Sequence, residues 1–419
     1  MKNDKKHYAW KVMLACILIK IGIDGMTMSA MGNFVTPIVQ ELGCGVSALT
    51  AYTSINAVAM ALLYTTAAKF LNTKNIGKIM GTAALIQVVG LGMMSTYHNV
   101  VMFYISGAII GLAQAFTGFV AIPVVINMWF KKNTGTVLGT VMATGSVATT
   151  LYSLLTGQLI NQFGWRTSYL IMAAIAAVVT VPAVFAIIRR PQEVGCLAHG
   201  AEDEPQVDLQ ASSGKGSFSL TKKQAMKLPL FYIAWLACIC FSYGSGVAYN
   251  TQTFATLELK QSITFGSIVG VALNLGTIFS SLAVGRINDR YGVKAGIGWG
   301  VVTTVLGYGM MFMSYHNPVF VLPAVFLVGL GNTMYTVQCP LLARTVVGDR
   351  DYSDIWAVMM VANSIIGGGL CFTIGLFYDL MGTFKGAFVM GAALFAMAAI
   401  LGFVAINMSK KLKEKLARA

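Results

Sequence analysis

Two opposite charges lie close together inside the first apolar segment of this sequence, at Lys20 and Asp24. Residues four apart are neighbours on one helix face, so the ammonium and the carboxylate can form an ion pair. Ionisable groups inside a membrane helix are costly, and they mark paths for ions or solutes. We expect Asp24 to accept a proton, or Lys20 to bind a substrate carboxylate, when the pair opens. The structural alternative is a static pair that fixes the helix.

The elements that must position this pair are long apolar segments. The 419 residues are 56% hydrophobic and 11% charged, whereas a soluble domain has about 25% charged residues. A membrane helix needs about 20 apolar residues, and that length recurs along the chain. We predict an all-α membrane protein with twelve transmembrane helices. The predicted spans are 8–38, 47–68, 77–96, 101–129, 135–162, 166–188, 229–257, 262–285, 295–315, 318–343, 353–381 and 384–408.

The net charge of +14 follows the predicted topology and does not indicate a nucleic-acid partner. Most of the 29 basic residues lie in the termini and in alternate loops, whereas Arg166, Lys260 and Lys385 lie on the other side. This asymmetry is the positive-inside pattern of a multi-pass protein with both termini in the cytoplasm. We therefore expect a protein of the cell membrane, in contact with the lipid bilayer.

The predicted helices divide into two sets of six. Residues 157–164 and 375–382 each hold two glycines seven apart, and both join a fifth helix to a sixth within their half. Such repeats place two similar bundles around a central site that opens alternately to either side. We predict an N-terminal bundle at 1–188, a polar cytoplasmic linker at 189–228 and a C-terminal bundle with a short tail at 229–419. In the linker, Thr221 and Gln224 have the spacing of a helix capping box.

A short loop after the eighth predicted helix carries a charged motif that includes Gly285, Asp289, Arg290 and Gly292. The motif resembles the signature loop of the major facilitator superfamily, and the resemblance covers nearly the whole chain. It implies the major facilitator fold, two pseudo-symmetric six-helix bundles, in which the aspartate meets a helix end and latches one conformation. A carboxylate is favoured at a helix N-terminus, which is consistent with that role. The first-half copy, residues 68–78, contains no carboxylate.

Further motifs resemble one branch of that superfamily, the oxalate/formate antiporters and monocarboxylate transporters. They are Trp129-Phe130 between the fourth and fifth helices, Gly164-Trp165-Arg166, and the segment 189–195. Members of the branch that handle oxalate carry a basic residue in the eighth and the eleventh helices. The corresponding positions here are Ser281 and Met359, so a dicarboxylate held by two such cations is not supported.

The resemblance also indicates which helices line the central cavity, and polar or amphipathic side chains on those helices are candidate substrate contacts. A polar group in the bilayer core needs a partner or a water-filled cavity. The structural alternative for each is an interhelical hydrogen bond, worth about 0.6 kcal/mol on average. The candidates are Asn56, Gln114, Tyr152, Tyr243, Asn274, Gln338, Trp356 and Asn363.

Together these features predict a secondary transporter of a small organic solute, a carboxylate in the leading version, working by proton symport or anion exchange. The alternative within this class is an efflux pump for an amphipathic drug-like or steroid-like compound. A sensor needs an output module that the loop and tail are too short to form, and a channel needs a filter sequence. The sequence shows no catalytic constellation, no nucleotide-binding motif and no metal-site spacing, so we expect no enzyme activity, cofactor or metal. We expect a monomer that binds its substrate and protons.

Overall fold

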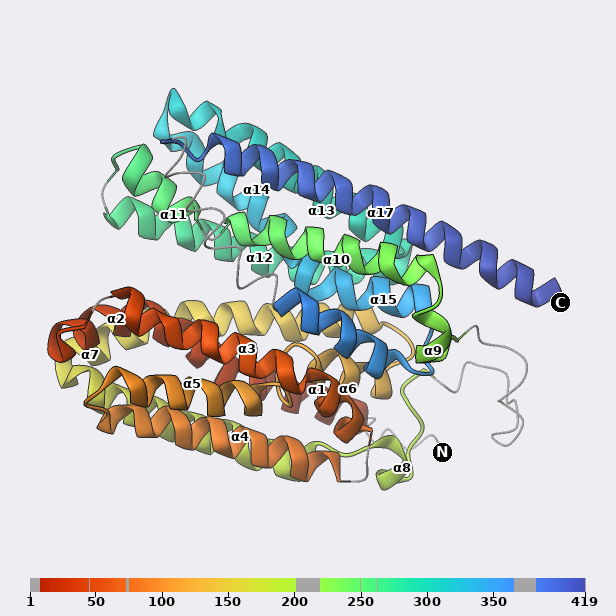
Figure 1. The fold of residues 1–419 in the computed structure, drawn as a ribbon, viewed down its shortest axis with the longest axis horizontal. Helices are drawn as coiled ribbons and strands as arrows, with labels where there is room; N and C mark the ends of the chain where they lie inside the picture. The colour runs from red at the N-terminus through yellow and green to blue at the C-terminus, as the bar shows by residue number, and fades with distance from the viewer. Residues whose placement is uncertain are drawn as a thin grey trace, which may run out of the picture. The chain divides into compact units, whose positions relative to one another are not determined.

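The computed structural model describes residues 8–44, 46–72, 75–200, 219–248, 250–261, 263–364 and 382–418. These residues form helices joined by short connections, with one isolated β-bridge between Phe130 and His199. Eight helices in the described part are long and apolar enough to cross a membrane. The contacts divide the chain into two units, which Figure 1 shows as two groups of long helices. Unit 1 comprises Met1–Thr134, Thr144–Pro205 and Met360–Ile365, and unit 2 comprises Gly135–Ala143, Gln206–Met359 and Ile366–Ala419.

The helices of the first half follow the predicted spans, except that the predicted span 101–129 is divided by a non-helical segment at 115–120. Within unit 1, α3 packs along α5, and α4 packs on the other side of α5 (Figure 1). The elements are α1 (Tyr8–Ile19), η1 (Lys20–Asp24), α2 (Gly25–Leu42), α3 (Val46–Leu71), α4 (Ile76–Met93), η2 (Met94–Thr96), α5 (Val100–Gln114), α6 (Ala121–Trp129), α7 (Thr134–Ile187) and α8 (Pro191–Val194). The first three form one span without a break.

Helix α7 contains two predicted spans in one continuous element. Gly164 has φ 73° and ψ 166°, a conformation outside the helical region, and it separates the spans 135–162 and 166–188. Glycine reaches a positive φ without the clash that a Cβ atom would cause. Gly382 has φ 64° and stands before α17 at the corresponding place in the second half. The other residues of the predicted 375–382 repeat lie outside the described residues.

The helices of the second half also follow the predicted spans. In unit 2, α12 packs along α14, and α17 packs along α10 and α13. The elements are α9 (Lys222–Ala225), α10 (Pro229–Ala248), α11 (Thr251–Thr253), η4 (Phe254–Glu258), α12 (Ile263–Tyr291), α13 (Val293–Met311), η5 (Met313–Tyr315), η6 (Pro318–Phe320), α14 (Val321–Thr333), η7 (Met334–Gln338), α15 (Cys339–Val347), a helix at 352–364, and α17 (Lys385–Arg418). Of the eleventh predicted span, residues 365–381 lie outside the described part.

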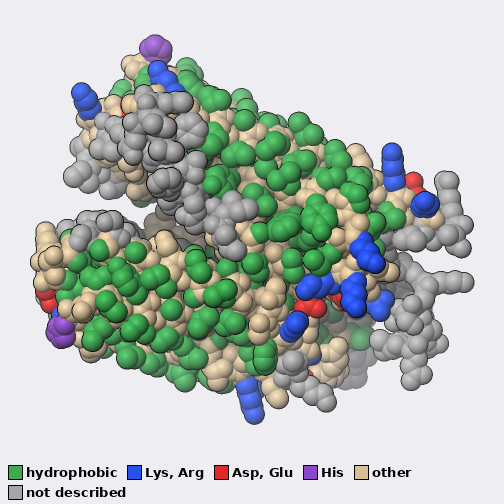
Figure 2. All heavy atoms as spheres, viewed as in Figure 1, with side chains coloured by type: hydrophobic (Ala, Val, Ile, Leu, Met, Phe, Trp, Pro, Cys, Tyr) green, Lys and Arg blue, Asp and Glu red, His purple; other side chains and the backbone are tan. Residues whose placement is uncertain are grey.

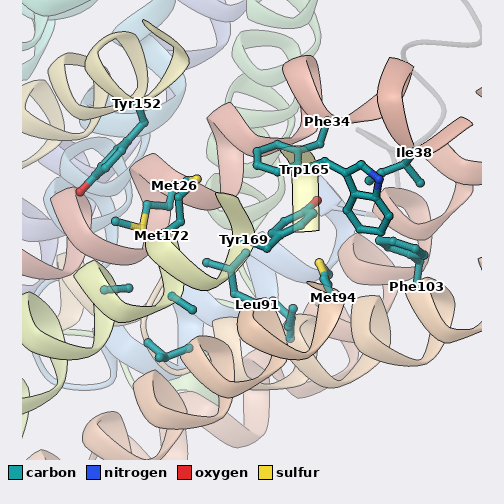
Figure 3. Close-up of a cluster of buried hydrophobic side chains, with 14 of the residues drawn as sticks. Met26, Phe34, Ile38, Leu91, Met94, Phe103, Tyr152, Trp165, Tyr169 and Met172 are labelled. Atoms are coloured by element: carbon teal, nitrogen blue, oxygen red, sulfur yellow. The ribbon is translucent and has the colours of Figure 1, made fainter. Parts of the chain in front are cut away.

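Each unit has its own aromatic and aliphatic core. In unit 1 the rings of Phe34 and Tyr169 lie 4.1 Å apart between centroids, with Trp165 beside them (Figure 3). In unit 2 the ring of Phe254 lies 4.9 Å from that of Phe388. Outside these cores, hydrophobic side chains cover much of the visible face of both units (Figure 2). Such a surface suits helices whose outer sides face lipid.

Both ends of the predicted linker are fixed to neighbouring helices. Arg190 donates through Nη2 to the Leu71 carbonyl at 2.6 Å, and Glu193 accepts from the Asn75 amide at 2.9 Å. The predicted capping box is confirmed, since Thr221 and Gln224 each accept a hydrogen bond from the other's backbone amide. Residues 201–218, the middle of the linker, lie outside the described residues.

Candidate functional site

The predicted ion pair is present and buried. Lys20 Nζ lies 2.6 Å from Asp24 Oδ2, and the two side chains are 6% and 12% exposed. Both residues belong to η1, a single π-helical turn between α1 and α2. Such turns are rare, and they are frequently found at functional sites. The ion pair therefore lies within a π-helical turn of the first helix, and its two charged groups are in direct contact.

The surroundings of Lys20 are apolar and closely packed. Its Nζ lies 5.1 Å from the centroid of the Phe119 ring, a distance at which a cation interacts favourably with the ring face. On α7, Gly145 leaves room for the lysine stem, because a Cβ atom at this position would lie 3.3 Å from Lys20 Cδ. Glycine at this position therefore permits α7 to approach the ion pair.

Two buried polar atoms at the pair or near it have no hydrogen-bond partner among the described residues. They are Asp24 Oδ1 and the Tyr64 hydroxyl; on the helix at 352–364, Asn363 Oδ1 is also without a partner. Tyr64, on α3, is fully buried and within electrostatic range of Asp24. Ser364 lies beside the Tyr64 hydroxyl, but without the geometry of a hydrogen bond. A buried polar group without a partner is unfavourable, so these atoms have unused capacity for a proton, a water or a solute.

A separate cavity lies within unit 1. It is lined by Asn56 and Gln114 together with Thr27, Tyr52 and Tyr169, among others. Its volume is about 50 Å³, which is room for a few waters. Asn56 donates to the Gly107 carbonyl at 3.3 Å. The structure thus brings two of the predicted residues together, whereas Lys20 and Asp24 are not part of this lining.

Gln338 is part of a hydrogen-bond network at one end of the helices of unit 2. Its Oε1 accepts from Asn288 Nδ2 at 2.7 Å, and its Nε2 donates to the Val293 carbonyl at 2.7 Å. Val293 begins α13, so the Gln338 side chain lies level with the start of that helix. Both polar atoms of its amide are used within the unit.

The other predicted contacts are distributed over both units. Tyr152 is 8% exposed and packs in the core of unit 1, with its ring directed away from Trp165 (Figure 3). Tyr243 packs against the core of unit 2, and Asn274 is half-buried on α12. Trp356 and Asn363, on the helix at 352–364, are 1% and 2% exposed.

The charged loop between α12 and α13 has the predicted geometry. Asp289 accepts from the backbone amides of Gly135 at 2.9 Å and Thr136 at 2.6 Å, at the start of α7. Gly285 permits this approach, because a Cβ atom there would lie 2.4 Å from the Gly135 carbonyl oxygen. The carboxylate therefore lies at a helix N-terminus, where the free amides and the helix dipole stabilise a negative charge.

The rest of this loop forms a tight connection. Gly292 has φ 84° and joins α12 directly to α13. Arg290 lies over the ring of Tyr291, with its Cζ atom 5.3 Å from the centroid. On α12, Ser281 donates to the Thr277 carbonyl at 2.9 Å, so its buried hydroxyl already has a partner.

Comparisons with known proteins agree with this fold. The model of the Major Facilitator Superfamily matches residues 17–262 and 235–419. A protein of Agrobacterium vitis named "Putative tartrate transporter" is 25% identical over 361 residues, covering 81% of this chain and 76% of the relative. The glucose-6-phosphate exchanger SLC37A2 of Bos taurus is 31% identical over 253 residues, 54% of this chain and 51% of its own.

The structure also resembles a solved transporter. The proton:xylose symporter XylE, bound to 6-bromo-6-deoxy-D-glucose, has a TM-score of 0.74 with 13% sequence identity, covering 95% of this chain and 96% of that one. The chain belongs to the Major Facilitator Superfamily, and it has that family's fold of twelve membrane helices. It is a multi-pass membrane transporter of small organic solutes and not an enzyme.

The residue that sequence reasoning missed is Tyr64. It lies on the second predicted helix, which the family resemblance places at the cavity, as it does for Asn56. Its hydropathy is that of an ordinary membrane-helix residue, so only its position on the helix could have singled it out.

Proposed function

We propose that this protein transports a small organic carboxylate by alternating access, with a proton or a second anion coupled to it through the Lys20–Asp24 pair. The observation that carries this proposal is the pair itself, buried, with Asp24 Oδ1 left without a partner. A buried ammonium is a ligand for an anion, and a buried carboxylate is a site for a proton. The relatives named for tartrate, glycerol-3-phosphate and glucose-6-phosphate are named for anionic solutes, which supports an anion here.

The ion pair can couple the binding of a substrate carboxylate to the binding of a proton, because an unpaired buried charge is unfavourable. When a substrate carboxylate replaces Asp24 at Lys20 Nζ, Asp24 becomes a buried anion without a cation. An unpaired buried charge is costly, and protonation of Asp24 removes it. Substrate binding and proton uptake at Asp24 therefore favour each other, as proton symport requires. In anion exchange, the second anion takes the place of the first at Lys20.

The contact of Asp289 with the start of α7 supports a latch for one conformation. The motif similarity to oxalate/formate antiporters and monocarboxylate transporters supports placing the chain in that branch. The charge distribution supports both termini in the cytoplasm and a location in the cell membrane. We further propose that the protein works as a monomer.

The test is counterflow in proteoliposomes with labelled formate, lactate, oxalate and tartrate. We expect exchange of at least one of them, and loss of that exchange in Lys20→Ala but not in Lys385→Ala, a matched lysine outside the pair. Absence of exchange with all four substrates would contradict the carboxylate proposal. Efflux of an amphipathic compound would then be tested with the same vesicles, because one relative is named as an efflux pump.

A further inference from the structure

A strongly basic surface lies at one end of unit 2, over α9 and the last turns of α17 (Figure 2). Met226, between two of its lysines, is an exposed apolar side chain, 40% accessible. We call this region the basic surface. Its exposed cations are Lys223, Lys227, Lys410, Lys411 and Lys415.

The fold brings its two segments together from distant parts of the sequence. The Leu220 amide, just before α9, donates to the Val347 carbonyl at 2.9 Å. Ser409, on α17, donates to the Val346 carbonyl at 3.0 Å, and Lys413 Nζ donates to the Thr345 carbonyl at 3.3 Å. The last turn of α15 is therefore a common neighbour of both segments, and their lysines belong to one surface.

The basic residues of this region outnumber its carboxylates, so the surface has a net positive charge. Asp351 accepts from the Lys222 amide at 2.8 Å, and Asp349 forms an ion pair with Arg344. On the end of α17, Glu414 is the exposed acidic residue beside the lysines.

The length of α17 places these lysines at the membrane surface. The helix has 34 residues, which corresponds to about 51 Å, whereas the hydrocarbon core of a bilayer is about 30 Å thick. Its apolar part ends before Lys410, so the cations follow where the hydrocarbon gives way to headgroups. Clusters of four to eight basic residues directly next to a membrane helix attract anionic lipids.

We propose that the basic surface binds the phosphate headgroups of anionic phospholipids. The lysines supply the counter-charge, while Met226 inserts between headgroups as exposed apolar residues of surface helices do. Binding holds α9, the end of the linker that belongs to unit 2, against the bilayer. This surface works independently of the substrate and of the Lys20–Asp24 pair.

The experiment measures binding of fluorescent phosphatidylglycerol to the full-length protein purified in detergent. In the double variant Lys410→Gln and Lys411→Gln we expect affinity to fall about 30-fold, from about 1 kcal/mol for each basic residue. The pair Lys223→Gln and Lys227→Gln should give a similar loss, since α9 contributes to the same surface. Binding should weaken steeply with added salt, as expected of charge attraction at a surface.

The matched control is Lys69→Gln with Lys78→Gln, two exposed lysines of unit 1, which should bind the probe as the unmodified protein does. An equal loss of affinity in this control would show that binding depends only on the net charge of the protein, which would overturn the proposal. Equal binding of fluorescent phosphatidylcholine would also overturn it. Competition by inorganic phosphate at equal concentration would show a free-anion site in place of a lipid site.

Discussion

The first helices of the two units end alike and differ in the middle. Glu41, at the end of α2, accepts from Trp165 Nε1 and from Arg166 Nε and Nη2, just after the kink at Gly164. Glu258, at the end of η4, accepts from the Tyr315 and Thr383 hydroxyls and from the Phe384 amide, just after Gly382. Each carboxylate thus connects the end of the unit's first helix to the start of its last.

The first helices of the two units differ in the residues at their middle. The offset of 217 residues that relates Glu41 to Glu258 relates Lys20 to Ala237 and Asp24 to Phe241. Ala237 and Phe241 are fully buried and apolar, whereas the equivalent positions in unit 1 hold the ion pair. Anchoring at the helix ends is shared, while the buried charge belongs to unit 1. The comparison teaches that the repeated parts build the fold and that the unrepeated pair is the candidate for coupling.

The largest effect should come from removing the pair, which makes the first helix of unit 1 resemble that of unit 2. We expect Lys20→Ala or Asp24→Asn to lower transport on the order of 100-fold, because each loses one partner of the coupled charges. The measurement is initial uptake in proteoliposomes, normalised to the amount of folded protein.

A double variant separates stability from transport in this experiment. With Lys20→Met and Asp24→Leu the apolar replacements leave no unpaired charge, so the protein should melt at or above the temperature of the unmodified protein. Transport should stay as low as in the single variants. If this variant takes up substrate at the rate of the unmodified protein, the Lys20–Asp24 pair has a structural role and no role in transport.

A smaller effect is expected at the loop that distinguishes the two halves. Asp289→Asn makes the second loop resemble the first-half copy, which has Asn72 and Asn75 and no carboxylate. Loss of the negative charge at the start of α7 should cost about 1 kcal/mol in the conformation that has this contact. We expect transport to fall several-fold while substrate affinity, measured by a thermal-shift titration, changes little. An unchanged rate of uptake would argue against the latch.

The two anchoring carboxylates should differ in stability. The Glu258 carboxylate accepts three hydrogen bonds, and the side-chain NH2 group of a Gln at this position cannot accept any of them. We therefore expect Glu258→Gln to lower the unfolding free energy by about 1–2 kcal/mol. Glu41→Gln should cost less than about 1 kcal/mol, because this carboxylate is half exposed and surface ion pairs contribute little. Thermal melting of both variants in one detergent gives the comparison. A larger loss in Glu41→Gln would reverse this ranking.

The smallest effect is a pH dependence at Glu41. The hydrogen bonds that Trp165 and Arg166 donate lower the pKa of Glu41 from its ordinary value. The stabilisation of the folded state by the ionised Glu41 is therefore fully present above the unfolded-state pKa of this residue. It is lost as the pH falls through the lower folded-state pKa. We expect Glu41→Gln to reduce the fall in melting temperature below about pH 4. If melting temperature falls with pH in the same way in both proteins, Glu41 does not contribute to the pH dependence of stability.

Much of the helical architecture could be predicted from the sequence, because apolar length is a local property. The break at Gly164, the capping box of Thr221 and Gln224 and the fold class were all accessible in this way. One repeat was not among the predicted features. Tyr97-His98-Asn99 recurs as Tyr315-His316-Asn317, and both asparagines cap the helix that follows.

The candidate site was only partly predictable. The spacing of Lys20 and Asp24 indicated a pair because both residues lie on one helix. The roles of Gln338 and Tyr64 depend on Asn288 and Asp24, which lie on other helices, and no spacing within one helix reveals such neighbours. Asn56 and Gln114 were both singled out, but their common cavity appeared only in the structure.

By itself, the sequence determined which segments are apolar and long enough to cross a membrane and which charges share a helix face, because hydropathy and helical periodicity act over short distances. Only the tertiary structure decided which polar groups are already satisfied and which remain free. That outcome depends on how separate helices approach one another, and glycines such as Gly145 and Gly285 control it by allowing backbone and side chain to meet.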